Sequence, residues 1–258
     1  MANRKHYNLR QMIASGYNSD DHSYIHKFGQ IAEAASDQFG TVWDVDDTVY
    51  PWASFDTAGT LSVVSDSTDD VNSTGTGAFN IVIEGLDNDY NVVSETILIN
   101  GETPVAGTVS FKRVYRAYVG AAGSTGNNVG KLSVLKGGVV VVCIRPQLNQ
   151  TLMAINTIPA GKTGYLYQVT STGEKDADFS GYVYARIGGT GLFRAQHVWD
   201  VTGGGQYVYN FSFPVRYSEK TDIDIRVLPR DNNRSTTACF DMLLVDDEPA
   251  RHPNSYGA

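Results

Sequence analysis

The stretch FNIVIEGLDNDYNVVSETILI (79–99) decides the fold class of this chain. Its first run places Phe79, Ile81 and Ile83 at alternate positions, and side chains of a β-strand point to alternate faces. The Asp- and Asn-rich residues 87–91 then interrupt the pattern before a second strand-like run begins. Two such runs joined by a short Asp/Asn loop predict a β-hairpin.

Strand-like runs separated by turn residues continue on both sides of the hairpin. Strands separated by evenly spaced turns predict an all-β chain that is β-sandwich or jelly-roll-like, with room for two β-units. No stretch has the length and helical period of a βαβ crossover, which argues against doubly wound folds. The other strand-like runs are LSVVS (61–65), FKRVYRAYVGAA (111–122), GKLSVL (130–135), VVVVCI (139–144), TLMAINTIPAGKTGYLYQVTS (151–171), DFSGYVYARIG (178–188), LFRAQHVWDV (192–201), YVYNFSFPVRY (207–217), DIDIRVLPR (222–230) and TACFDMLLVDD (237–247).

The domain organisation follows from changes in composition. Residues 1–42 are polar and without sustained period, and they read either as an extended N-terminal arm that orders against a neighbour or as a disordered leader. A short helix is expected at 31–39, ahead of the stop signal Gly40. Residues 43–136 are expected to form a first β-unit, 137–248 a second, and 249–258 a polar tail.

Composition bounds the class of protein. The 258 residues carry a net charge of −8, which argues against general nucleic-acid binding because that normally needs a basic face. No cleavable apolar segment opens the chain, and the longest apolar run is far too short to span a bilayer. We therefore expect a soluble protein made in the cytoplasm. Cys143 and Cys239 lie in apolar runs, as buried thiols or as a disulfide.

One motif suggests catalysis. WDVDDTVYP (43–51) matches the haloacid-dehalogenase phosphatase signature, in which Asp44 would be the nucleophile and Asp46 the acid/base, with Mg²⁺ neutralising the phosphate. That chemistry needs a hydrophobic strand before the first Asp and helices around a parallel sheet, and neither pattern is present. LLVDDEPA (243–250) resembles the opening of a receiver domain, but it stands at the wrong end of the chain. A solvated acidic turn at 43–51 is the preferred interpretation.

Metal and phosphate motifs fail on spacing. DNDYN (87–91) begins like an EF-hand loop, but Val92 and Leu98 stand where that loop needs Gly and Glu, so an irregular Ca²⁺ site or an Asx turn remains. TGGGQ (202–206) is followed by no helix pattern and is expected to connect two strands. We expect no catalytic, cofactor-binding or metal-binding residues and no enzymatic activity. The histidines also lack ligand spacing: His6, His22, His26, His197 and His252.

Tyrosines occur in pairs two or three residues apart. Residues at i and i+2 share one face of a strand, so several pairs are expected to form aromatic ridges. Core packing, a subunit interface and a sugar-binding platform are the three interpretations that remain. The paired residues are Tyr115, Tyr118, Tyr165, Tyr167, Tyr182, Tyr184, Tyr207 and Tyr209.

Several stretches together resemble a family of uncharacterised virion structural proteins of tailed bacteriophages, marine and cyanobacterial phages among them. The resemblance covers about residues 25 to 247 and rests on turn and strand patterns. The stretches are IHKFG (25–29), GTGAFNIVIEGLDNDYNVVSETILINGETPV (75–105), FKRVYRAYVGAAGS (111–124), QTLMAINTIPAGKTGYLYQV (150–169), SEKTDIDIRV (218–227) and FDMLLVDD (240–247).

The resemblance implies a non-enzymatic part of a phage particle. We expect a capsid decoration or cement protein on the outer shell, with a head–tail or tail component as the alternative. A carbohydrate-binding module for host attachment is the alternative of another class. The expected partners are the major capsid protein or neighbouring virion proteins, with self-association as a homotrimer because decoration proteins sit at local three-fold positions. No nucleic acid, membrane or cofactor is expected, and the expected location is the virion.

Overall fold

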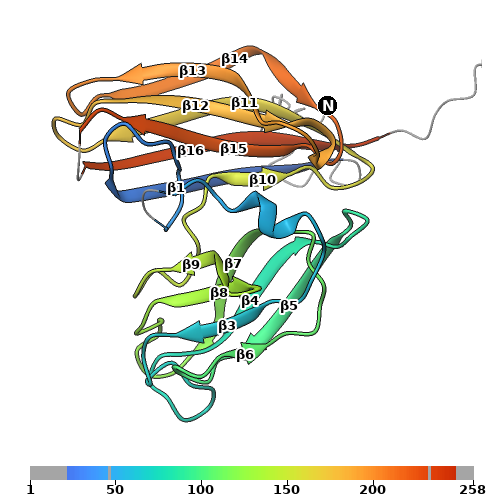
Figure 1. Cartoon of the computed structure of the whole chain (residues 1–258), viewed down its shortest axis with the longest axis vertical. Coiled ribbons are helices and arrows are strands. Elements are labelled where there is room, and N and C mark those ends of the chain that lie inside the picture. The colour runs from blue at the N-terminus through green and yellow to red at the C-terminus, as the bar shows by residue number, and fades with distance from the viewer. Residues whose placement is uncertain (1–21, 46–47, 232–233, 248–258) are drawn as a thin grey trace, which may run out of the picture.

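The computed structural model describes residues 22–45, 48–231 and 234–247. The all-β prediction is confirmed, because the described residues form sixteen strands in four sheets and two short 3₁₀ turns, Trp52–Phe55 and Ile187–Gly189. Figure 1 shows two stacked units. No helix in the described ranges is long and apolar enough to cross a membrane. We call residues 22–42 and 154–247 the larger unit and residues 43–153 the smaller unit.

Two sheets build the larger unit. One has the order β1 (His22–Ala34), β16 (Arg234–Asp246), β11 (Lys162–Gly173) and β14 (Gln206–Tyr217). In the other, β15 (Asp222–Pro229) pairs with β12 (Phe179–Arg186), which pairs with β13 (Arg194–Val201). The free side of β15 is shared by β10 (Ile155–Thr157) and the short β2 (Gly40–Thr41).

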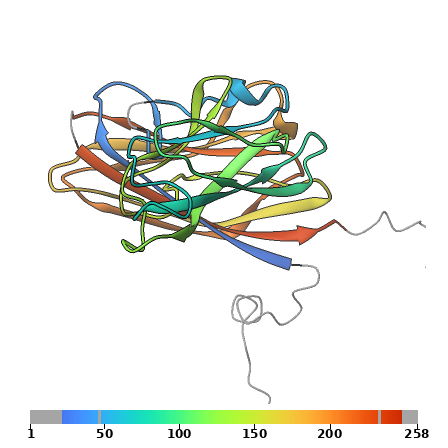
Figure 2. The ribbon, with the colours of Figure 1, turned by 90° about the horizontal axis from the view of Figure 1, so that it is seen from below.

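The two sheets face each other across one apolar core. Val169, Phe240 and Met242 contribute from the first sheet, and Val183 and Ile225 from the second, each fully or almost fully buried. The alternation seen in the sequence produces this core, since every second residue of these strands turns inward. Figure 2, which views the molecule from below, shows the strands of the two units layered over one another.

The smaller unit is inserted into the larger one. It contains two sheets of order β6 (Val105–Ala106), β3 (Ser62–Ser65), β8 (Leu132–Lys136), β9 (Val139–Ile144) and β5 (Val92–Leu98), β4 (Ala78–Leu86), β7 (Arg113–Ala122). The predicted hairpin at 79–99 is confirmed as β4 and β5. Its own core includes Phe55, Ile81, Phe111 and Val142.

The entry and exit of the insertion lie side by side. The backbone N–H of Ala154 donates to the carbonyl of Val42 at 2.8 Å, and Trp43 forms an isolated bridge with Met153. We call these paired segments, 42–43 and 153–154, the stalk. β1 passes close to the stalk at Gly29, where a Cβ would lie 2.0 Å from the Val42 carbonyl oxygen. Only glycine allows two backbones to approach so closely.

The structure corrects two of the expected boundaries. A limit at 136 would separate β8 from β9, which pair along their whole length, so the smaller unit continues past Ile144. The expected arm at 1–42 contains β1, which pairs with β16 from His22 to Ala34. The parts of the arm and tail at 1–21 and 248–258 lie outside the described residues.

The expected helix at 31–39 is also wrong. Ile31 and Ala34 lie in the last four residues of β1. They are 1 % and 2 % exposed, because their side chains pack in the core of the larger unit. A helix-favouring composition in the stretch IAEAASDQF is overridden by pairing with β16 and by burial. The chain then turns at Asp37, which has a positive φ of 59°.

A buried ionic network joins the two units. The Asp222 carboxylate of β15 is fully buried and accepts hydrogen bonds from Arg113 of β7, with Nε at 2.7 Å, and from Arg186 of β12, with Nε at 2.8 Å. The Thr157 hydroxyl donates to the same carboxylate at 2.6 Å. Because Arg113 belongs to the smaller unit, these contacts fix one unit on the other.

Candidate interaction surface

The structure first locates the residues that suggested chemistry. Asp44 is 7 % exposed, and its carboxylate accepts a hydrogen bond from Arg145 Nε at 2.7 Å and from the backbone N–H of Leu152 at 2.8 Å. It therefore holds the end of the smaller unit in place beside the stalk, rather than standing in an open cleft. Asp46 lies outside the described residues.

The acidic loop 87–91 forms an Asx turn. The Asp87 carboxylate accepts backbone hydrogen bonds from Asp89 and Asn91, each at 2.9 Å, so its oxygens organise the hairpin turn. No group of three or more His, Cys, Asp or Glu residues in the described ranges could hold a metal ion. Cys143 and Cys239 form no disulfide, so that alternative does not apply.

The expected aromatic ridges form at two of the tyrosine pairs. Tyr182 and Tyr184 of β12 have ring centroids 5.8 Å apart, and Phe39 packs edge-on against both rings. Tyr207 and Tyr209 of β14 are stacked at 6.2 Å with an interplanar angle of 5°. The loop at 202–206 connects β13 and β14, as the sequence predicts.

An aromatic cluster fills the gap between β13 and β14, where the two sheets of the larger unit end. The His197 ring lies 4.8 Å from that of Tyr209 and 5.3 Å from that of Phe211, and its Nε2 is 2.7 Å from the Tyr207 hydroxyl. Burial lowers the pKa of His197, which favours the neutral imidazole. β13 and β14 are thereby held together by rings rather than by a backbone ladder.

Trp199 anchors the cluster to the core. Its ring stacks on that of Tyr207 at 5.2 Å, and its Nε1–H donates to the Ser171 hydroxyl at 2.7 Å. It lies directly over Gly181, where a Cβ would stand 2.2 Å from the indole. The tryptophan is only 4 % exposed, so it offers no face to a sugar ring.

β13 and β14 also carry exposed apolar side chains. We define the β13–β14 edge as Val198, Val208, Tyr209 and Phe213, which are exposed by between 41 % and 90 %. Thirteen large apolar residues are exposed in the described ranges, and four of them belong to this edge. This group of exposed apolar side chains makes the edge a candidate interaction surface.

Phe213 projects from a bulge. Opposite the single residue Tyr167 of β11, β14 has four residues, Phe211 to Pro214, so the strand bows outward there. Phe213 is 90 % exposed at this bulge. The bulge and the proline also prevent a further strand from pairing along this part of β14. The edge is thus built to make side-chain contacts and not to extend the sheet.

The edge has a definite place in the molecule. In Figure 1, β13 and β14 form the side of the larger unit that lies farthest from the smaller unit. The β13–β14 edge and the inserted unit therefore lie at opposite ends of the molecule. The sequence pattern indicated Tyr207 and Tyr209 but not Phe213 and Val208. In the run YVYNFSFPVRY, apolar residues occur at both odd and even positions, so the pattern does not show which face of the strand is exposed.

Comparison with known proteins adds little to this geometry. No protein-family model matches the chain, and no curated protein matches it. Among solved structures, one that matches is the "Structure of infectious bursal disease virus Gt strain". The match covers 91 % of this chain and 74 % of that chain at 10 % identity, with a TM-score of 0.25. A likeness at that score carries no argument about fold or function.

Proposed function

We propose that the larger unit is a jelly-roll with the smaller unit inserted in its second strand. If β2 and β10 are counted as one interrupted strand, the larger unit has eight strands. A jelly-roll is a long hairpin whose strands pair first with eighth, second with seventh, third with sixth and fourth with fifth before it rolls up. The pairs β1–β16, β10–β15, β11–β14 and β12–β13 follow this order and support the proposal.

The chain is, in this proposal, a structural component of a bacteriophage virion, with capsid decoration as its first role. The observation that carries it is the β13–β14 edge, an exposed apolar end on a rigid β-scaffold opposite a projecting unit. In this arrangement the edge contacts neighbouring copies, and the inserted unit projects on the opposite side. Jelly-rolls occur in viral capsid proteins, and also in lectins and cupins, so the fold supports the class without selecting the role.

The partners in this proposal are further copies of the chain and the shell protein beneath it. Copies contact one another through the β13–β14 edge, and three-fold association matches the local symmetry of an icosahedral shell. The net charge of −8 supports a role that involves neither nucleic acid nor anionic membrane surfaces. A head–tail or tail position is the alternative within the same class.

Two measurements test the proposal. Mass spectrometry of purified particles should count about one copy per copy of major shell protein; about a dozen copies per particle would place the chain in the portal or tail instead. Absence from particles would overturn the virion role. Sedimentation equilibrium should then show an oligomer that Phe213→Ser dissociates by about tenfold or more in Kd, since fully buried aromatic side chains dominate interfaces.

The matched control for the interface is Leu98→Ser. Leu98 is 51 % exposed on β5 of the smaller unit, so this change removes an exposed apolar side chain far from the β13–β14 edge. It should leave the association constant unchanged. Equal behaviour of the two variants would refute the edge as the interface. Retention of the chain on a glycan array, lost in Tyr209→Ala, would instead favour a carbohydrate-binding module.

A further inference from the structure

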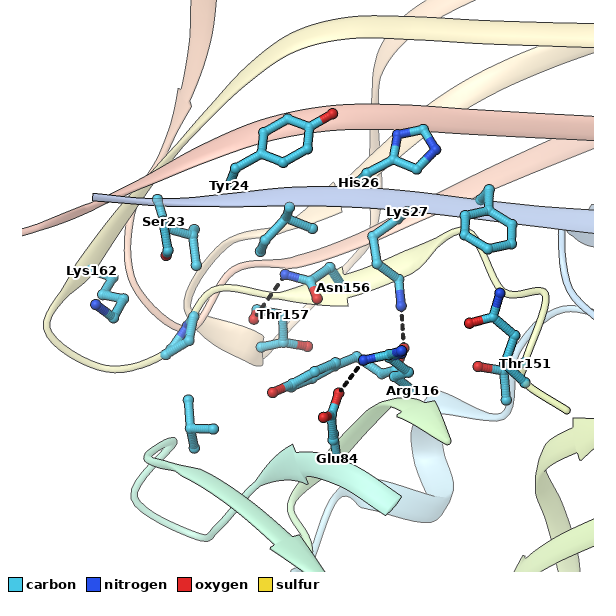
Figure 3. Close-up of a pocket in the computed structure, with 17 residues that line it drawn as sticks. Ser23, Tyr24, His26, Lys27, Glu84, Arg116, Thr151, Asn156, Thr157 and Lys162 are labelled. Carbon is cyan, nitrogen blue, oxygen red and sulfur yellow. Dashed lines mark hydrogen bonds and ion pairs between the residues drawn. The ribbon is translucent and has the colours of Figure 1, made fainter. Parts of the chain in front are cut away.

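A crevice of about 400 Å³ lies between the two units (Figure 3). It lies beside β1, at the opposite end of its sheet from β14. One wall is formed by six consecutive residues of β1, Ser23 to Phe28. The facing wall comes from the smaller unit, with Glu84, Tyr115 and Arg116 on β4 and β7. Asn156 and neighbouring residues of the larger unit close its end.

β1 presents the open edge of its sheet to this crevice. It is the terminal strand of that sheet, and β16 is its single partner strand in the described ranges. Figure 3 shows Lys27 pointing into the crevice and Tyr24 and His26 pointing away from it. The latter two side chains contact Asp241 at 2.6 Å on the outer face of the sheet. An open strand edge with alternating side chains beside a crevice is the geometry that accepts an extended peptide as an added strand.

Lys27 gives the crevice a chemical preference. The residue is 9 % exposed, and its amine donates a hydrogen bond to the backbone carbonyl of Tyr115. No carboxylate lies within ion-pair distance of this amine in the part of the chain that the structure describes. Burial, helped by the nearby Arg116 charge, lowers the pKa of Lys27 to about 7, and Glu84 acts in the opposite direction. A carboxylate placed beside this buried amine favours its protonated form and raises its pKa again.

The other charges around the crevice already have partners. Arg116 forms an ion pair with Glu84 at 3.3 Å and lies over the Tyr118 ring. Lys162 pairs with Asp246. Lys27 is therefore the lining cation that an incoming acidic group can neutralise without breaking an existing ion pair.

We propose that this crevice is a peptide-binding groove that takes an extended acidic segment of a partner protein, added as a strand to β1 with one carboxylate on Lys27. The backbone of β1 supplies sequence-independent hydrogen bonds, and the Lys27 amine selects a Glu or Asp at one position. This inference goes beyond the proposed function, because the groove lies on another face and would link this chain to a different protein. Its test uses the isolated chain and no particles.

The probe is a capped hexapeptide of sequence Thr-Val-Glu-Val-Thr-Val, with a second peptide carrying Gln in place of Glu. Titration of each into the isotopically labelled chain should shift the backbone amides of residues 23–28. The Glu peptide should bind about tenfold more tightly than the Gln peptide, as expected for one charge-assisted hydrogen bond in a buried site. Its affinity should decrease several-fold from pH 6 to pH 9 as the Lys27 amine loses its proton.

Two variants separate the groove from a general charge effect. Lys27→Met should remove the preference for Glu over Gln while leaving the chain folded. Lys162→Met, which removes another crevice cation that is already paired, should keep the preference. The proposal is overturned if neither peptide shifts residues 23–28, if the two peptides bind equally, or if the preference survives in Lys27→Met. None of these results would bear on self-association through the β13–β14 edge.

Discussion

Substitution of Asp222 by Ala should loosen the joint between the two units. The Asp222 carboxylate accepts hydrogen bonds from Arg113 Nε at 2.7 Å, Arg113 Nη2 at 3.0 Å and Arg186 Nε at 2.8 Å, all in a site from which water is excluded. The arginine side chains are only 2 % and 9 % exposed. Removal of the carboxylate leaves two buried cations facing one another without a counter-charge.

The magnitude follows from that geometry. Removal of one partner of a buried ion pair costs about 3–5 kcal/mol. Because one carboxylate here serves two arginines, we expect a loss of about 5 kcal/mol in the free energy of unfolding. For a chain of this size about 1 kcal/mol corresponds to roughly 2–4 °C in Tm, so the transition should move down by about 10–20 °C. Urea unfolding and scanning calorimetry measure both quantities.

The matched control is Asp200→Ala. Asp200 forms an ion pair with Arg230 at the same 2.7 Å as the Arg113–Asp222 contact, but its side chains are 60 % and 52 % exposed. Exposed pairs contribute about 0–1 kcal/mol, so this variant should be nearly as stable as the wild type. If Asp222→Ala loses no more stability than Asp200→Ala, the network is not what joins the units.

Two further changes test other parts of the structure. In the wild type, the pKa of Lys27 is about 7 in the folded state and about 10.5 in the unfolded state. Between these pH values the unfolded chain binds one more proton than the folded chain, so the free energy of unfolding rises with pH. Between pH 8 and 9 the wild type should gain about 1 kcal/mol more than Lys27→Met, as measured by urea titration; parallel curves would contradict the burial of this amine. Gly181→Ala places a methyl group against the Trp199 indole and should cost about 2 kcal/mol or more with a change in tryptophan fluorescence, whereas unchanged stability and emission would refute the packing described for this ring.

The hairpin and the all-β class were predictable because they depend on local alternation. The run from Phe79 to Ile99 carries its own turn, and neighbouring strands repeat the same pattern. The position of β1 was not predictable from local sequence. On its outer face, Tyr24 and His26 contact Asp241, which is more than two hundred residues away in the sequence. Only the tertiary pairing with β16 makes this polar stretch a strand.

The two-unit division shows the same limit. Strong turn signals at Gly137 and Gly138 suggest a boundary, but this turn is a tight connection with positive φ between paired strands. The Lys27 crevice left no signal in the sequence, since its lining comes from β1, β4, β7 and β10. The β13–β14 edge was partly visible as aromatic pairs, but exposure of Phe213 depends on a bulge that spacing does not reveal.

The paired stalk at Val42 and Ala154 has a consequence for how such a protein can diversify. A backbone hydrogen bond of 2.8 Å joins Ala154 to Val42, so the inserted unit begins and ends at nearly one point. Any module whose own termini lie close together could be exchanged there without rethreading the scaffold. Such an exchange would also have to replace the contact that Arg113 of the inserted unit makes with the buried Asp222.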